Sequence, residues 1–178
     1  MGRKLSSLKS LATDKRTGQQ CAMSKSLKRV KAALEAAGLG TEVLEMPGET
    51  RTAADAAREA GCEIDQIAKS IIFRGEDSGG VVLFITAGGN QVDPAKASEV
   101  AGEALGRADA AFVRAVTGFA IGGVAPLGHL NPPRVFFDPR LSDFEVVYAA
   151  AGTPRHIFPV HPADLARVTG AESADFTT

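Results

Sequence analysis

The amino-acid sequence predicts a single α/β domain in which a mixed β-sheet carries helices on its faces. Its 178 residues suit one domain, and a hydrophobic content of 44% is enough to bury a sizeable core. Short runs of β-branched and aromatic residues alternate along the chain with helical patterns of apolar residues. We expect the domain to occupy residues 23–178, and residues 1–22 to form a basic, poorly ordered and dispensable tail.

Helices are predicted from apolar spacing and from the residues that begin and end them. The first begins at Ser24 or Ser26, carries apolar residues at spacings of three and four, and ends before Gly38. The second follows Thr52, covers 53–60 and ends at Gly61. A short helical turn is expected at 64–68, and further helices at 94–102, 112–116 and 162–168.

Strands are predicted at 41–46, 69–74, 81–86, 134–138, 145–150 and 156–160, where β-branched and aromatic residues gather. The run 81–86 is apolar at every position but the last. We therefore expect it in the middle of the sheet, covered on both faces. Residues 75–80 read as a hairpin loop, and Asp138-Pro139 as the start of a turn.

Several classes of function are disfavoured by what the sequence lacks. There is no apolar run of about 18 residues and no signal-type stretch, so we expect no membrane contact and a cytoplasmic protein. Two cysteines and three histidines lack the spacing of metal ligands, so no metal or other cofactor is expected. Nucleophile-elbow, P-loop and dinucleotide motifs are missing, and one tyrosine without tryptophan makes a weak base-stacking platform.

Charge is distributed unevenly along the chain. Residues 1–31 hold nine Lys or Arg and a single acid, Asp14, whereas the remainder is acidic. A basic arm of this kind either touches nucleic-acid phosphates or is simply solvated. The acidic body argues against tight, nonspecific binding of nucleic acid. Any nucleic-acid contact is expected to be local, with the basic helix at 25–31 as a candidate.

The most informative segment is the glycine-rich loop at 117–129, Thr-Gly-Phe-Ala-Ile-Gly-Gly-Val-Ala-Pro-Leu-Gly-His. It is too apolar for a linker and too rich in glycine for an ordinary core element. Glycine permits positive φ and close approach of another molecule to the main chain, and Pro126 stiffens the loop. The segment is therefore either a tight turn between buried elements or a loop that offers backbone groups to a small ligand.

Lys69 is the first candidate among charged side chains. It is the only charge in 66–73 and stands at the entrance to a hydrophobic strand. Its ammonium either lies in water at an edge or points into a pocket, where it would bind a phosphate or carbonyl oxygen. Of the histidines, His129 ends the glycine loop, His156 follows a turn able to line a cleft, and His161 reads as structural.

Three segments together are similar to the YbaK-like family, the free-standing relatives of the editing domain of bacterial prolyl-tRNA synthetases. They are Lys69-Ser70-Ile71-Ile72-Phe73, the glycine loop, and Ala151-Gly152-Thr153-Pro154-Arg155-His156. The resemblance covers residues 24–169 and implies the mixed α/β editing-domain fold. It also implies an aminoacyl-tRNA hydrolase, which cleaves the ester between a wrong amino acid and the terminal adenosine of tRNA.

The resemblance assigns roles to particular residues. Lys69 corresponds to the family's strand lysine, Gly122–Pro126 matches its Gly-x-x-x-Pro loop, and His156 matches a late histidine that some members carry. Catalytic residues are thus expected to be Lys69, Gly122, Gly123 and His156. Substrate-binding residues are expected to be Ser70, Ile71, Phe119, Val124, Ala125, Pro126, His129 and Gly152. Some members carry asparagine where this chain has Ser70, so the amino acid removed stays open.

The expected chemistry is ester hydrolysis with backbone N–H groups of the loop stabilising the oxyanion. We expect the Lys69 amine at the pocket mouth, near the backbone of Gly122–Pro126, and a methyl at Gly123 to intrude on the ester. The partners implied are an aminoacyl-tRNA 3′ end and a tRNA synthetase. A trans-acting deacylase of small amino acids such as Ala, Cys, Ser or Thr, on proline tRNA, is the leading reading. A non-catalytic tRNA- or synthetase-binding module and a hydrolase of another small ester or amide stay open.

Overall fold

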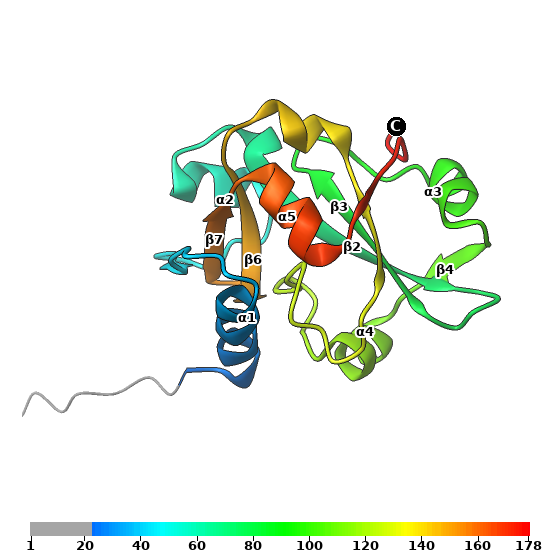
Figure 1. Ribbon diagram of the computed structural model, residues 1–178, viewed down its shortest axis with the longest axis horizontal. Coiled ribbons are helices and arrows are strands. Elements are labelled where there is room, and N and C mark those ends of the chain that lie inside the picture. The colour runs from blue at the N-terminus through cyan, green and yellow to red at the C-terminus, as the bar shows by residue number, and fades with distance from the viewer. Residues whose placement is uncertain (1–22) are drawn as a thin grey trace, which may run out of the picture.

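In the computed structural model, which describes residues 23–178, an antiparallel hairpin forms the centre of a mixed sheet (Figure 1). The hairpin joins β2 (Ile67–Gly75) to β3 (Val81–Ala87). All seven residues of β3 are buried, which confirms the expected central strand. The strands lie in the order β1-β7-β6-β2-β3-β5-β8, and β4 pairs with β2 outside this path.

The remaining strands are short and lie on both sides of the hairpin. They are β1 (Leu44–Glu45), β4 (Leu105–Arg107), β5 (Arg134–Phe137), β6 (Val147–Thr153), β7 (His156–Val160) and β8 (Glu172–Ser173). β6 and β5 run parallel to their neighbours β2 and β3, whereas β7 and β4 pair antiparallel. The sheet is therefore mixed, as the sequence predicted.

The helices begin and end where the capping residues indicate. They are α1 (Lys25–Ala36), α2 (Ala53–Ala60), α3 (Pro94–Ala101), α4 (Ala110–Thr117) and α5 (Pro162–Thr169), with 3-10 turns η1 (Ile64–Gln66) and η2 (Pro139–Asp143). Ser24 caps α1, Thr52 caps α2 and Asp93 caps α3 through side-chain oxygens. Left-handed Gly61 and Gly102 end α2 and α3.

Two layers of helices bury the two faces of the sheet (Figure 1). On one face, Leu27 and Val30 of α1, Val113 of α4 and Leu165 of α5 join the largest core cluster. On the other face, α3 contributes small residues that pack against a group of phenylalanines centred on Phe84. β-Strand alternation sends successive side chains of β2 to opposite layers, and this decides where its polar residues lie.

Some predicted elements differ in extent from those observed. The strand expected at 41–46 is reduced to Leu44–Glu45, and β2 starts two residues earlier than expected, at Ile67. β4 and β8 were not predicted, because each is only two or three residues long and carries little periodicity. The tail expected at 1–22 lies outside the described residues. Within 23–178, none of the helices has the length and apolar character needed to span a membrane.

Candidate active site

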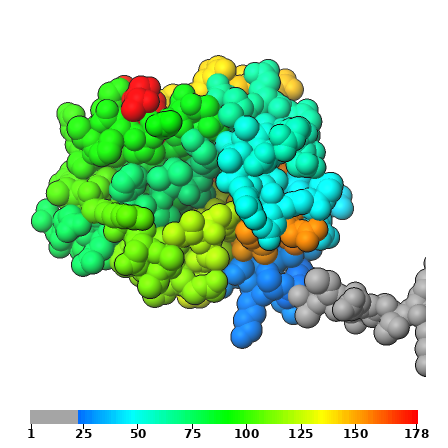
Figure 2. Space-filling view, turned by 180° about the vertical axis from the view of Figure 1, so that it is seen from behind, coloured from blue at the N-terminus to red at the C-terminus, as the bar shows by residue number. Residues whose placement is uncertain are grey.

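A cavity of about 380 Å³ lies at the edge of β2, where the predicted lysine strand and glycine loop meet. Its wall is completed by the segment that leads into α2 and by the β6–β7 hairpin. Seen from behind, these segments lie side by side, cyan, orange and yellow-green (Figure 2). The lining residues are Thr50, Arg51, Thr52, Ala53, Ile67–Ile72, Ala108, Val113, Ile121, Gly122, Val124, Tyr148, Ala150 and Ile157. Most of the wall is aliphatic, so the cavity suits a small ligand with an apolar part.

Contacts from α1 hold the glycine loop in place. The Arg29 guanidinium donates to the carbonyls of Gly128 at 2.6 Å and Thr117 at 3.4 Å, and it stacks over the ring of Phe119. The Thr117 hydroxyl bonds back to Val113 and accepts from the Phe119 amide. Arg29, a member of the basic helix that we considered for tRNA contact, is therefore occupied by the loop.

Gly123 packs against the main chain of the β6–β7 hairpin. A Cβ built on Gly123 would lie 2.7 Å from Thr153 Cα and 2.8 Å from its carbonyl carbon. The expectation that a methyl here would meet the ester is therefore wrong, because Thr153 already fills that space. Gly122 is different. Its φ is +93°, its nearest obstacle is Pro154 Cγ at 4.0 Å, and it lines the cavity.

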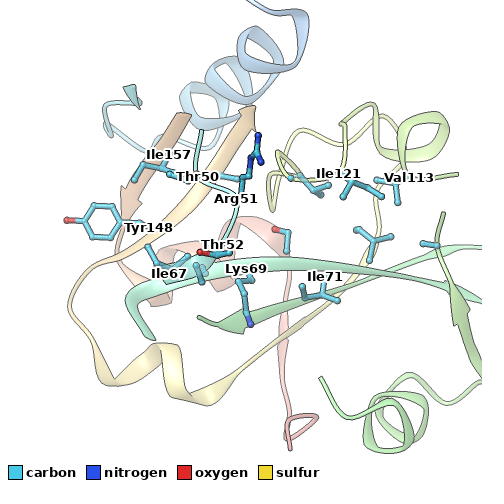
Figure 3. A pocket seen from close by; sticks show the side chains of 18 residues that line it. Thr50, Arg51, Thr52, Ile67, Lys69, Ile71, Val113, Ile121, Tyr148 and Ile157 are labelled. Carbon is cyan, nitrogen blue, oxygen red and sulfur yellow. The ribbon is translucent and has the colours of Figure 1, made fainter. Parts of the chain in front are cut away.

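Lys69 lines the same cavity as Gly122 and Val124, but its amine turns away from the glycine loop. Its Nζ donates to the carbonyl of Asn90 at 2.5 Å. Figure 3 shows Lys69 and Ile71 projecting to one side of β2 and Ile121 and Val113 lying on the other. Strand alternation is the cause, since Lys69 shares a face with Ile71 whereas the loop packs on the opposite face. The amine is thus not beside Gly122–Pro126, as the sequence led us to expect.

Partial burial lowers the pKa of the Lys69 amine, and the Asp138 and Asp65 carboxylates oppose that shift. Asp138, which the sequence suggested was a turn residue, is only 2% exposed. Its carboxylate accepts from Ala87 N at 3.0 Å, from the Asn90 side-chain amide at 2.9 Å and from Arg140 N at 3.0 Å. Asp138 therefore fixes Asn90, and Asn90 in turn holds the lysine.

A second carboxylate fastens the same turn. Asp65 accepts from Gly89 N at 2.9 Å and from Arg140 Nε at 3.0 Å. A Cβ on Gly88 would overlap the carbonyl of Ile64, so the turn sits tightly on η1. The sequence signal that could have indicated this arrangement is Gly88-Gly89-Asn90 directly after a buried strand, followed by a carboxylate at the end of another.

The structure brings together only part of the predicted site. Lys69, Ser70, Ile71, Gly122 and Val124 line the cavity. Gly123, His156, Phe119, Ala125, Pro126, His129 and Gly152 are not among the residues that line it. Sequence reasoning missed the segment Thr50–Ala53 and the residues Ala108, Tyr148, Ala150 and Ile157, because none of them stands in a recognisable motif.

Both candidate histidines serve contacts within the chain. His129 Nε2 lies 2.6 Å from the Ala125 carbonyl, and its ring packs edge-on against Phe119. Burial lowers the pKa of His129, more than the Ala125 carbonyl raises it. His156 Nδ1 lies 2.6 Å from the Thr153 hydroxyl. Because Ile157 lines the cavity, strand alternation turns His156 to the other side of β7.

The cavity offers main-chain groups and few reactive side chains. None of the described residues that line it is an aspartate, glutamate, histidine or cysteine. Gly123 N donates to Ala120 O, whereas no hydrogen bond within residues 23–178 engages Gly122 N or Val124 N. Arg51 stands exposed at the wall, and among residues 23–178 its one charged contact is a long one, 3.8 Å to Glu49. Such a site can bind and polarise a carbonyl group through N–H donors.

The fold and this cavity define a class of protein. Residues 47–168 match the model of the aminoacyl-tRNA editing domain, and the chain belongs to this family. The matched range contains the cavity wall from Thr50 to Ile157, including β2 and the glycine loop. The expected family and fold are thereby confirmed.

Individual proteins are similar to this chain in sequence and in structure. A crystal structure named as a putative trans-editing enzyme for prolyl tRNA synthetase is 44% identical, with a TM-score of 0.83 over 88% of this chain and 99% of that one. The hypothetical protein APE2540 is 29% identical, with a TM-score of 0.78 over 84% and 99% of the two chains. The uncharacterized protein YwhH of Bacillus subtilis is 32% identical over 124 residues, which are 70% of this chain and 78% of YwhH.

Proposed function

We propose that this protein is a trans-acting aminoacyl-tRNA deacylase that hydrolyses the ester of a small amino acid on a mischarged tRNA. The observation that carries the proposal is the cavity in which β2 and the glycine loop of an editing domain meet. The relative named for prolyl-tRNA synthetase trans-editing makes proline tRNA the first substrate to test. The tRNA 3′ end would enter at the exposed side of the cavity, near Arg51.

The residues at the wall suit hydrolysis of an activated ester. Water attacks the ester carbonyl, the carbonyl oxygen becomes an oxyanion, and the ribose oxygen leaves with a proton. The N–H groups of Gly122 and Val124 are the donors that we assign to the oxyanion, and one such donor is typically worth about 100- to 1,000-fold in rate. With no acidic or imidazole side chain in the wall, water activation would fall to substrate hydroxyls and main-chain carbonyls.

Lys69 would act through charge and position. Its amine keeps two N–H donors after bonding to Asn90, and it stands at the wall beside Ser70 and Ile71. An ammonium there would hold a phosphate or hydroxyl of the 3′ end and so place the ester at the glycine loop. The aliphatic wall would exclude large side chains, and one methylene is worth about 1–3 kcal/mol in such discrimination.

The test is a deacylation panel with tRNA charged with alanine, cysteine, serine, threonine or proline. We expect rapid hydrolysis of one or more small aminoacyl esters, and loss of most activity in Lys69→Ala with the fold retained. Lys69→Arg should rescue poorly, because a planar guanidinium does not replace a compact ammonium. Lys96→Ala is the matched control, since Lys96 lies on α3 and forms a surface salt bridge to Asp175.

The panel also separates the alternatives. Binding of tRNA without hydrolysis of any ester would favour the non-catalytic binding module. Hydrolysis of free aminoacyl esters at the same rate as charged tRNA would favour a hydrolase of other small esters.

A further inference from the structure

The edge of β2 is interrupted between two neighbouring strands. β6 pairs with β2 only at Ile67 and Ala68, and β4 pairs only at Phe73–Gly75. The four residues 69–72 between them have a strand partner on the β3 side alone. The sheet therefore contains a window four residues long, and the same residues line the cavity.

Main-chain hydrogen bonds of successive residues in β2 point alternately to its two edges, and this alternation determines which groups face the window. Gly75 N donates to Gly80 O within the hairpin, and Glu76 N donates to Ala104 O on the opposite edge. In an antiparallel pair these directions alternate residue by residue. Lys69 and Ile71 therefore bond to β3, and Ser70 and Ile72 direct their main-chain groups to the opposite edge, where those of Ser70 point into the window.

The two main-chain groups of Ser70 have no strand partner on that edge in the part of the chain that the structure describes. The Phe73–Arg107 pair at the end of β4 places the carbonyl of Ile72 opposite Ala108 N, whereas neither β4 nor β6 reaches the N–H or C=O of Ser70. The Ser70 hydroxyl is also buried without a partner among these residues. Polar main-chain groups in a protein wall are almost always satisfied, by protein, water or ligand.

We propose that the Ser70–Ile72 edge binds the α-amino acid part of the substrate as a neighbouring strand would. This inference rests on the proposed function and adds the group that is recognised. An aminoacyl ester carries an α-ammonium donor and a carbonyl acceptor on either side of one carbon, as a strand residue carries N–H and C=O. The ammonium would donate to Ser70 O, and the ester carbonyl would accept from Ser70 N, as in one antiparallel bridge.

Recognition of this kind has a consequence for substrate choice. The main chain of β2 would require a free α-ammonium whatever the amino acid side chain, whereas the aliphatic wall would limit side-chain size. Esters with an α-hydroxyl lose a charged donor, and N-acylated or peptidyl esters lose it and add bulk. The site would therefore select aminoacyl over peptidyl and hydroxyacyl esters.

The test uses non-hydrolysable analogues, so that binding is measured apart from catalysis. The probes are adenosine carrying a 3′-alanylamido group and the counterpart carrying a 3′-(2-hydroxypropanoyl)amido group. We expect the alanyl probe to bind about 10- to 100-fold more tightly, the usual range for a hydrogen bond to a charged group. Equal affinity for the two probes, or no binding of the alanyl probe at millimolar concentration, would overturn the proposal.

Amide hydrogen exchange of the full chain supplies a residue-level readout. In the free protein, Lys69 and Ile71 amides should exchange slowly, and Ser70 and Ile72 amides quickly. The alanyl probe should slow Ser70 by at least 10-fold and leave Lys69 and Ile71 unchanged. Slow exchange of Ser70 in the free protein, or no change at Ser70 on binding, would contradict the assignment.

Variants separate the main chain of Ser70 from its hydroxyl. Ser70→Ala removes only the hydroxyl and should bind the alanyl probe within a few-fold of wild type. Ser70→Pro removes the N–H that faces the window and breaks no bond to β3, so it should fold and bind at least 10-fold more weakly.

If probe binding and protection occur without hydrolysis in the tRNA panel, this site stands and the deacylase proposal fails. Hydrolysis without protection of Ser70 would leave the deacylase and remove this site.

Discussion

Substitution of Gly123 by alanine tests whether the glycine loop is shaped by its packing on the β6–β7 hairpin. The added Cβ would lie 2.7, 2.8 and 3.0 Å from Thr153 Cα, C and N, all main-chain atoms that cannot rotate away. Gly123 is not among the glycines with positive φ, so the substitution adds no conformational strain. Its cost is steric.

The magnitude follows from the size of the overlap. Ordinary Cβ contacts start near 3.4 Å and the shortest one here would be 2.7 Å, so the loop and the hairpin must separate by about 0.7 Å. Overpacking of this kind costs about 1–3 kcal/mol. For a domain of this size each kilocalorie lowers the thermal midpoint by about 2–4 °C, so we expect a drop of about 2–12 °C.

The assay is thermal and urea unfolding of Gly123→Ala beside Gly122→Ala and the double variant Gly123→Ala/Thr153→Ala. Gly122 has open space but a φ of +93°, so alanine there should cost about 1–2 kcal/mol through backbone strain and place a methyl in the cavity. Trimming Thr153 should not rescue Gly123→Ala, because the clash is with its backbone. An unchanged midpoint for Gly123→Ala, or rescue by Thr153→Ala, would refute this reasoning.

Three further changes test other parts of the structure. Asp138→Asn should lower the free energy of unfolding by about 3 kcal/mol in urea titrations, because the amide cannot accept from all three N–H donors that the carboxylate engages. The same substitution should reduce deacylation by releasing Asn90 and Lys69. Burial lowers the pKa of His129 below its usual 6.5 in the folded state. The free energy of unfolding should therefore keep its full His129 contribution above pH 6.5 and fall as the pH drops below that value. His129→Gln should reduce the difference in unfolding free energy between pH 5 and pH 7.5, measured by urea titration. Ala150→Leu should narrow the cavity and reduce hydrolysis of the largest accepted amino acid at least 10-fold more than that of alanine, and an equal loss for both would place Ala150 outside the side-chain pocket.

The sequence predicted the elements whose signals are local. Ser24, Thr52 and Asp93 begin helices, and the run at 81–86 is buried from end to end, because capping and apolar patterning act within a few residues. The family resemblance also indicated a strand and a loop that both contribute to the wall of one cavity.

The details of the site depend on contacts between distant segments. The amine of Lys69 turns to Asn90 because its position in β2 assigns it to one face, and the sequence alone does not say which face holds the loop. Taken alone, Asp138 looks like a turn residue, yet its carboxylate is buried and accepts hydrogen bonds from Ala87, Asn90 and Arg140. Ala87 and Asn90 are about 50 residues away in the sequence, so no local pattern indicates these bonds. Phe119 and His129, both in the glycine loop, pack into its interior instead of facing the cavity.

An unpaired strand edge is ordinarily a hazard, because it can recruit a strand from another molecule and begin aggregation. In this fold the vacant stretch of β2 lies inside the sheet, with β6 at one end and β4 at the other. The glycine loop and the segment before α2 stand over it. A window of four residues is too short and too enclosed for a foreign strand to extend the sheet. The main-chain groups of Ser70 thus stay available to a ligand without creating an edge that promotes aggregation.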